Sequence, residues 1–402
     1  MGLILTRSPF HISRGQLDSN ASLTVSIGRM NGSNLEVEET YSLNFRENLF
    51  IDISSLCSSV YRPTYSFVSV WNQYVTSFIG DGLKFYETGY VSVTLSGSIN
   101  GVAQSDQVTN YFCTDGYAYS SEKIDKDFVE ELTQRSFYAG SSDTIYKLDD
   151  SNIRVPILNP NMYSGDEYVD VSFMSKGDVV YTESLLYRDS GTSVFTVSRW
   201  AKTFDYPSFL NRVNSEGGEF EQSNCIDDFF NENKIDDVDE VYISSANNVK
   251  ILKVKTVEEC KYNPYRITFR NRYGVMEDLW FFKKSEESIS VKSNEFRANQ
   301  FKRRSSGGRG RDAGLARSSQ EYSKNGVQSV ILNSGFVDEV LNESFKQLML
   351  SEEVELYDFN KDVLSAVKIK DSELKLKTST NDKLINYTIE VEMSNNIIDN
   401  IS

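Results

Sequence analysis

The stretch that decides the fold reads NPYRITFRNRYGVMEDLWFFKK and spans residues 263–284. Within it, residues 265–269 carry Tyr, Ile and Phe at every second position, which is the alternation of a strand with one apolar face. Residues 271–274 (Asn-Arg-Tyr-Gly) predict a turn, because glycine can supply the positive φ that a tight turn requires. Residues 275–282 then return as a second apolar strand. The stretch therefore predicts a β-hairpin at the start of the C-terminal third of the chain.

The same alternation recurs upstream of this hairpin. Short strands separated by Gly and Asn turns are typical of a β-sandwich. In the first 115 residues, strands are expected at 22–27, 41–45, 49–53, 66–71 and 90–95. A second group is expected at 144–148, 153–157, 168–174, 178–187 and 193–200. Between the two groups, Ile124, Phe128 and Leu132 lie four residues apart and predict one helix.

Downstream of the hairpin, apolar residues recur at a spacing of three to four. This spacing predicts an amphipathic helix at 336–350 on the strength of Val337, Val340, Leu341, Phe345 and Leu348. Strands are expected after it at 354–357, 364–369, 374–377 and 384–391. The C-terminal third is therefore predicted to be β-rich with a single amphipathic helix.

These patterns predict a mainly β, multidomain chain. Two N-terminal β-sandwich-like domains are expected at 1–118 and 119–260, followed by a β-rich C-terminal domain at 261–402. Residues 201–239 lack the alternation of strands. We interpret them as a long loop with a short helix.

The charge of the chain is unevenly distributed. It carries 42 Lys and Arg against 58 Asp and Glu, a formal net charge of −16. An acidic run at 227–240 lacks the central glycine of an EF-hand loop, so we interpret it as a solvated loop or as a docking site for a basic partner. An Arg/Gly-rich loop at 301–319 has the opposite charge. Its candidate partner-contact residues are Lys302, Arg303, Arg304, Arg309, Arg311 and Arg317.

This basic loop has three interpretations. It can be a mobile connection between two ordered elements, or it can contact an acidic neighbouring subunit, since opposite potentials steer and orient assembly. Arg/Gly segments also contact phosphates. No aromatic residue lies between Phe301 and Tyr322, so base stacking is not supported. With a net charge of −16, nucleic acid is not an expected partner.

The sequence lacks the patterns of common catalytic sites. A single histidine, His11, excludes most histidine-based catalysis and any metal site built from several imidazoles. No phosphate-binding, dinucleotide-binding or nucleophile-elbow motif is present. The four cysteines form no C-x-x-C pair and are expected to be free thiols. We therefore expect no enzyme and no cofactor or metal.

The chain is also expected to contain no membrane segment. No stretch approaches the ~18–20 continuous apolar residues of a membrane helix. The first ten residues, MGLILTRSPF, lack the basic and long apolar regions of a secretory leader. We expect a protein made in a reducing cytoplasm.

Three blocks of the C-terminal third carry a resemblance to a known family. Residues 263–284, 329–354 and 377–391 resemble, in order and spacing, virion structural proteins of tailed bacteriophages, especially marine phages and phages of Bacteroidetes-like hosts. The early segments 8–12 and 50–54 resemble the same family. The resemblance implies a tail, neck or baseplate component and no catalytic residues.

The expected function is a non-enzymatic structural component of a tailed-phage virion, at the tail tip, the baseplate or the tail-to-fibre connection. Its partners would be copies of itself in a ring or trimer and neighbouring tail proteins, after assembly in the host cytoplasm. An alternative is a glycan- or receptor-binding module of a phage tail that stacks sugars on Trp71, Trp200 and Trp280. A third is an enzyme that degrades cell-surface polysaccharide with a carboxylate pair.

Overall fold

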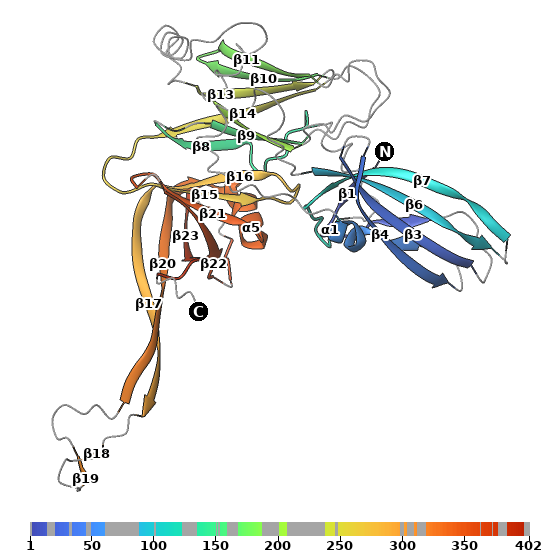
Figure 1. Ribbon diagram of the computed structural model, residues 1–402. Coiled ribbons are helices and arrows are strands. Elements are labelled where there is room, and N and C mark those ends of the chain that lie inside the picture. The colour runs from blue at the N-terminus through green and yellow to red at the C-terminus, as the bar shows by residue number, and fades with distance from the viewer. Residues whose placement is uncertain are drawn as a thin grey trace, which may run out of the picture.

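The computed structural model confirms a mainly β, multidomain chain with several sheets (Figure 1). It describes residues 2–13, 21–31, 34–45, 50–60, 88–99, 102–122, 135–149, 151, 153–158, 168–186, 201–206, 238–245, 248–297, 301–303, 309–311, 319–361, 363–371, 373–376 and 384–397. The predicted helix around Phe128 and the predicted strands at 66–71 and 193–200 lie outside these residues. In the described part of the chain, no helix is both long and apolar enough to cross a membrane.

The first sheet has five strands in the order β1-β7-β6-β3-β4, with β1 parallel to β7. Their bounds are β1 (Gly2–Leu5), β3 (Ala21–Asn31), β4 (Asn34–Phe45), β6 (Thr88–Ile99) and β7 (Val102–Thr114). Alternate residues of β3 and β6, including Val25, Ile27, Val91 and Val93, are buried. Period-2 alternation therefore gives this sheet one apolar face, as predicted.

A helix and a short strand pair pack against that apolar face. They are α1 (Ser54–Val60), β2 (His11–Ser13) and β5 (Phe50–Asp52), and β2 pairs with β5. The sequence did not predict α1. Asp52 Oδ1 accepts hydrogen bonds from the Ser54 N–H (3.0 Å) and hydroxyl (2.7 Å), which satisfies a donor at the start of the helix.

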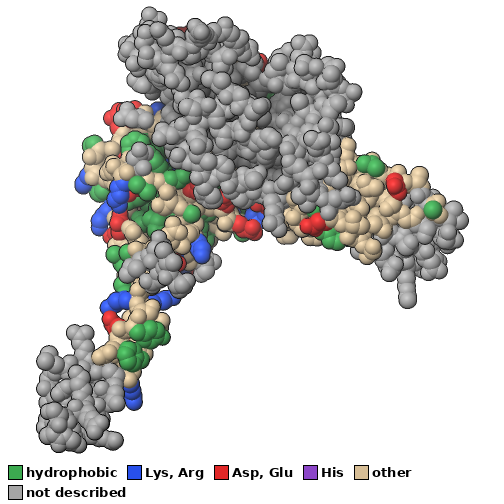
Figure 2. All heavy atoms as spheres, in the orientation of Figure 1, with side chains coloured by type: hydrophobic (Ala, Val, Ile, Leu, Met, Phe, Trp, Pro, Cys, Tyr) green, Lys and Arg blue, Asp and Glu red, His purple; other side chains and the backbone are tan. Residues whose placement is uncertain are grey.

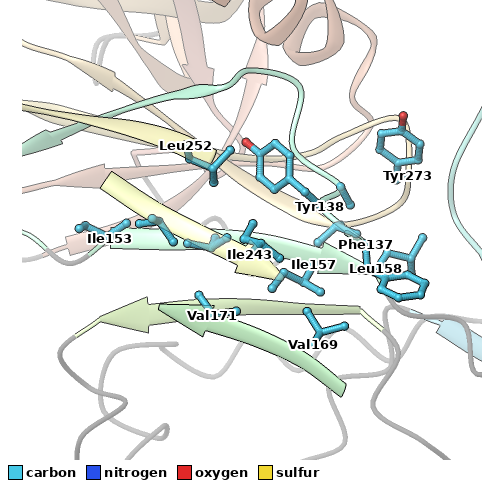
Figure 3. Close-up of a cluster of buried hydrophobic side chains, with 14 of the residues drawn as sticks. Phe137, Tyr138, Ile153, Ile157, Leu158, Val169, Val171, Ile243, Leu252 and Tyr273 are labelled. Atoms are coloured by element: carbon cyan, nitrogen blue, oxygen red, sulfur yellow. The ribbon is translucent and has the colours of Figure 1, made fainter. Parts of the chain in front are cut away.

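The second unit consists of two stacked sheets. The larger has the order β11-β10-β13-β14-β8, and the smaller pairs β9 with β12. Their bounds are β8 (Thr144–Leu148), β9 (Ile153–Leu158), β10 (Tyr168–Ser175), β11 (Asp178–Leu186), β12 (Ala201–Tyr206), β13 (Glu240–Ser245) and β14 (Asn248–Val257). Figure 3 shows Ile157 of β9 beside Val169 and Val171 of β10, and all three belong to one apolar core.

Strand β12 corrects the prediction that a loop begins at residue 201. Each of its six residues pairs with a residue of β9, so this segment completes the smaller sheet. Its pairing partners in β9 lie far upstream in sequence, so the local pattern alone does not identify this pairing. The rest of the predicted loop, including residues 227–237 of the acidic run, lies outside the described residues.

The third unit is a seven-stranded sheet in the order β16-β15-β21-β22-β23-β20-β17. Its strands are β15 (Tyr265–Arg270), β16 (Met276–Phe281), β17 (Lys283–Arg297), β20 (Ser319–Asp338), β21 (Val354–Asp358), β22 (Val363–Ile369) and β23 (Leu384–Met393). The predicted hairpin is confirmed as β15–β16. Strands β16 and β17 are the two ends of this strand order, yet only Phe282 separates them in the sequence. The sheet therefore curls round into an open barrel.

Helix α5 (Asn342–Leu350) closes the core of this barrel. The Phe345 ring lies 6.1 Å from the Phe281 ring and 4.3 Å from the Tyr387 ring, measured between centroids. The prediction of a helix beginning at 336 is wrong at its start. Strand β20 continues to Asp338, and a 3-10 turn, η3 (Glu339–Leu341), precedes the helix. Val337 is buried and pairs with Ile385, so it belongs to strand β20 and its side chain packs in the barrel core.

The strands predicted at 354–357, 364–369 and 384–391 are confirmed as β21, β22 and β23. The strand predicted at 374–377 is wrong for its described residues, because 373–376 form no strand. Leu374 packs against the barrel core while Leu376 is exposed, so the two leucines do not share a buried face.

Candidate interaction arm and domain junction

Strands β17 and β20 extend well beyond the barrel as a two-stranded antiparallel ribbon (Figure 1). Strand β23 pairs with β20 only from Ser329 onward. We define the arm as the described residues between Ser288 and Ser329, which are themselves a cross-strand pair. Every β17 residue from Glu286 to Arg297 is exposed. The β17 strand of the arm therefore presents its side chains to solvent instead of to a core.

Four large apolar or aromatic side chains are exposed on the arm. The exposed fractions are 64% for Ile289, 54% for Val291, 47% for Phe296 and 68% for Tyr322. The Phe296 and Tyr322 rings lie 6.2 Å apart between centroids. Figure 2 shows hydrophobic and basic side chains near one another along the arm. An isolated two-stranded ribbon is at best marginally stable in water, so this arm is suited to stabilisation by a partner.

The far end of the arm gathers four of the six predicted contact residues. Strand β18 (Phe301–Arg303) pairs with β19 (Arg309–Arg311), which corrects the prediction of a loop without strands. The pairing sets Lys302 opposite Gly310, Arg303 opposite Arg309 and Phe301 opposite Arg311. The backbone pairing therefore brings four basic residues of the sequence into one short hairpin. The other two candidates, Arg304 and Arg317, lie outside the described residues.

Ion pairs tie the base of the arm to the barrel and to the segment between β14 and β15. Lys283 Nζ lies 2.8 Å from Glu259 Oε2, and Lys361 Nζ lies 3.1 Å from Glu287 Oε1. The hydrogen bond from Lys283 is the main cause that lowers the pKa of Glu259. The Tyr265 hydroxyl also donates to Glu287 at 3.2 Å. These contacts hold β17 at the point where it leaves the barrel.

The turn of the β15–β16 hairpin lies where the three units meet. Arg270, whose side chain is 2% exposed, pairs with Asp115 after the first sheet (3.0 Å) and with Glu353 of the barrel (2.6 Å). Asn271 Nδ2 donates to the Ala139 carbonyl of the second unit at 2.6 Å. The guanidinium of Arg272 pairs with Glu122 at 2.9 Å. This one turn therefore joins all three units.

Sequence reasoning identified this turn but missed its role as a junction. A usable signal was present, because Arg270, Asn271 and Arg272 form a run of three polar residues next to the turn of a hairpin rich in aromatic residues. All three are buried, and buried polar groups require partners. Those partners lie far away in sequence, so local pattern could not identify them.

Gly274 allows the junction to close. Its φ is +80°, and a Cβ there would lie 3.0 Å from the Asp115 nitrogen and 3.0 Å from the Thr114 Cβ. Gly177 also has a positive φ, of +90°, but a Cβ there would meet no atom within 4 Å. Gly177 is therefore a matched control for backbone strain without packing.

We expect Gly274→Ala to lower the thermal stability more than Gly177→Ala does. The control carries only the cost of the left-handed backbone, about 1–2 kcal/mol. Gly274→Ala adds displacement of the segment that follows β7. Calorimetric unfolding of both variants measures the difference. Equal losses would show that the close approach at Gly274 contributes nothing to the junction.

A buried charged cluster joins the second unit to the barrel. Asp278 of β16 lies 3.2 Å from Arg154 of β9 and 3.8 Å from Arg266 of β15. Burial opposes ionisation of Asp278, but the two guanidinium groups and a hydrogen bond from Thr268 hold its pKa below the ordinary value. The carboxylate is therefore an ionised structural partner of both arginines.

Trp280 does not provide a surface for stacking sugars, which corrects one element of the glycan-binding alternative. It is buried, and its ring stacks on Phe282 at 6.0 Å with an interplanar angle of 9°. The Arg266 guanidinium lies 5.8 Å from the Trp280 ring centroid. The other two tryptophans of that alternative, Trp71 and Trp200, lie outside the described residues.

Glu277 is a buried carboxyl at the contact between α5 and the second unit. It accepts hydrogen bonds from the Ser141 hydroxyl (2.5 Å), the Ser141 N–H (3.1 Å) and Asn271 Nδ2 (3.0 Å). Burial raises the pKa of Glu277 in spite of these hydrogen bonds. In the folded state the protonated form is therefore favoured relative to the unfolded chain.

This raised pKa predicts a specific pH dependence. The stability contributed by Glu277 is fully present below its unfolded-state pKa and is lost as pH rises through the folded-state pKa. Glu277→Gln keeps an acceptor and removes the proton linkage. The variant should therefore lose less stability than the parent between acid and neutral pH. Urea-unfolding midpoints across that range test this, with Glu321→Gln on the exposed arm as control. Parallel pH profiles for Glu277→Gln and the parent would contradict it.

The cavity next to this carboxyl is small. It is lined by Glu277, Asp278, Ser344 and neighbouring residues and has a volume of about 30 Å³, the space of about one water molecule. Among the residues that the structure describes, no three His, Cys, Asp or Glu side chains are grouped to hold a metal ion. Cys57, Cys113 and Cys260 are free thiols.

The arm and the junction differ in what they can do. The junction is buried and its charged side chains form ion pairs with one another, whereas the arm leaves apolar and charged side chains exposed to solvent. The arm is therefore the candidate site for binding another macromolecule. No protein-family model matches the chain, and no curated protein is significantly similar to it in sequence.

Proposed function

We propose that this protein is a non-enzymatic structural subunit that assembles through its arm with other copies of itself and with neighbouring proteins. The exposed arm, with Ile289, Val291, Phe296 and Tyr322 on its surface, is the observation that carries the proposal. Monomeric proteins seldom project contiguous apolar side chains on a ribbon that lacks a core of its own. A partner that covers the arm would remove this surface from water.

Charge supports the same proposal. The chain carries a net charge of −16, yet the tip of its arm combines Lys302, Arg303, Arg309 and Arg311. A basic tip at the end of an extended arm can reach an acidic surface on another copy, because opposite potentials attract and orient the two. Added salt should weaken a contact of this kind.

We propose further that the assembly is the tail of a bacteriophage, with the subunit at the tail tip, the baseplate or the tail-to-fibre connection. This part rests on the resemblance of residues 263–284, 329–354 and 377–391 to virion structural proteins. A ring or trimer suits such a location, since virion proteins make repeated symmetric contacts. The proposed function requires no cofactor and no nucleic acid.

Imaging of purified particles tests the location. Particles carrying a peptide tag inserted in the β10–β11 turn, at Gly177, should bind gold-labelled antibody on the tail. That turn is an open site, because no atom of the described residues lies within 4 Å of a Cβ placed at Gly177. A tagged protein that is expressed and folded but absent from purified particles would overturn the virion assignment.

A further inference from the structure

The outer edge of β17 is unpaired along the arm. In the strand order of the barrel, β17 is terminal, and among the described residues it pairs with β20 alone. Figure 1 shows this edge running free along the arm. A strand edge exposes a row of backbone N–H and C=O groups that can pair with another strand. Native proteins protect such edges or use them for pairing.

The sequence of β17 is complementary to itself when it is read in the antiparallel direction about Ile289. Glu286 and Lys292 lie three residues from Ile289 on opposite sides, so an antiparallel copy sets each glutamate opposite a lysine. Ser288 and Ser290 are similarly set opposite each other. Opposite-charge and hydroxyl pairs at facing positions stabilise antiparallel strands.

The two faces of the strand are complementary in different ways. Ile289 and Val291 lie on one face, because side chains alternate along a strand, while Glu286, Ser288 and Lys292 lie on the other. On the apolar face, Gly326 is paired with Val291, and Ile397 lies beside Gly326. Ile397 is 50% exposed and extends the apolar surface. Glu287 shares this face and would lie opposite Val291 of the other copy, while its carboxylate stays paired with Lys361. Antiparallel pairing would therefore join the two apolar patches around Ile289 on one face and form two ion pairs on the other.

The charged residues of this segment are available for such pairing. Among the described residues, Lys292 has no ion-pair partner, and Glu286 has only an exposed pairing with Lys284 at 2.9 Å. Strand β17 keeps a regular register with β20 from Glu286 to Asn294, and the register shifts on the barrel side of Glu286 and between Asn294 and Glu295. The complementary segment is therefore continuous strand.

We propose that β17 pairs edge to edge with β17 of a second copy, antiparallel and about a two-fold axis at Ile289. The two arms then form one four-stranded sheet, and the tip of each arm lies level with the body of the other copy. This inference rests on the proposed self-assembly and names its contact. In this arrangement the basic tip of each arm can reach the body of the other copy, whose net charge is −16.

Cysteine cross-linking tests the axis. Only the residue on the axis meets its own counterpart, so Ile289→Cys should yield a cross-linked dimer under mild oxidation or with a short bis-maleimide. Val291→Cys is the matched control, because it lies on the same face with similar exposure but four residues away from its own counterpart. Both variants are made with Cys225 and Cys260 replaced by serine, since Cys260 is an exposed thiol.

Charge exchange provides an independent test of register. Glu286→Lys and Lys292→Glu should each raise the dissociation constant of the dimer by about tenfold, because two-fold symmetry makes each reversal act twice. The combined exchange, Glu286→Lys with Lys292→Glu, should restore most of the affinity. Sedimentation or light scattering measures the dissociation constant of the parent, the two single variants and the double variant.

The outcomes separate this inference from the proposed function. The pairing is supported if the Ile289→Cys variant cross-links and the Val291→Cys variant does not, and if the double charge exchange restores the affinity of the dimer. If the parent chain self-associates but both cysteine variants cross-link equally or neither does, the pairing is wrong and assembly occurs elsewhere. If the parent chain shows no self-association at any concentration, both this inference and the proposed self-assembly are overturned.

Discussion

Replacing Arg270 with alanine is expected to lower the free energy of unfolding by about 3–5 kcal/mol. The Arg270 side chain is 2% exposed and lies between Asp115 and Glu353, at 3.0 Å and 2.6 Å. Without the guanidinium, two mostly buried carboxylates lose the positive charge that lies between them. The contact between the first sheet and the barrel should weaken most. Calorimetric unfolding of the full chain measures the loss.

Two comparisons distinguish this effect from the loss of an ordinary ion pair. Lys324→Ala removes a pair with Glu321 whose partners are 56% and 46% exposed, and such pairs contribute about 0–1 kcal/mol. Adding Asp115→Asn and Glu353→Gln to Arg270→Ala should recover part of the stability, because it removes the unpaired charges. Similar losses for Arg270→Ala and Lys324→Ala would show that the junction does not depend on this arginine.

Much of the fold could be predicted from the sequence where strands pair locally. The β15–β16 hairpin was predictable because Tyr265, Ile267 and Phe269 alternate and Gly274 marks the turn between adjacent strands. The start of α5 could not be predicted in this way. Val337 and Leu341 have a spacing that fits a helix, but Val337 pairs with Ile385 in the sheet. A short apolar segment can satisfy either period, and tertiary pairing decides between them.

The arm was less predictable than its tip. The Lys and Arg residues of the tip stand out by composition, whereas β17 is rich in Ser, Glu and Lys and alternates apolar with polar residues only at Ile289 and Val291. Its pairing with β20 closes a loop of more than twenty residues at Arg297, so no local turn signal announces it. The junction was hidden for a related reason: Arg270 is 155 residues from Asp115 and 83 from Glu353.

Removing the arm is expected to abolish self-association without unfolding the barrel. Ser288 and Ser329 are a cross-strand pair, so an Asn-Gly turn in place of residues 289–328 closes a short hairpin between them. The buried residues that β20 contributes to the barrel core, Val330, Leu332 and Val337, remain in this variant. An unfolding transition of the truncated chain in calorimetry is the control that shows that the barrel still folds.

A second control addresses exposed apolar side chains in general. Val179 of β11 is 60% exposed, close to the value for Ile289, but it lies in the second unit away from the arm. Val179→Lys should leave self-association unchanged. If it reduces association as strongly as removal of the arm does, general surface hydrophobicity and not the arm drives assembly.

The most direct test is the molar mass of the full and arm-truncated chains in solution, measured by multi-angle light scattering over a range of concentrations. The full chain, of 45.7 kDa per subunit, should reach a multiple of that mass as concentration rises, and the truncated chain should stay at the mass of one subunit. A truncated chain that still forms the same multimer, or a full chain that remains a single subunit throughout, would contradict assembly through the arm.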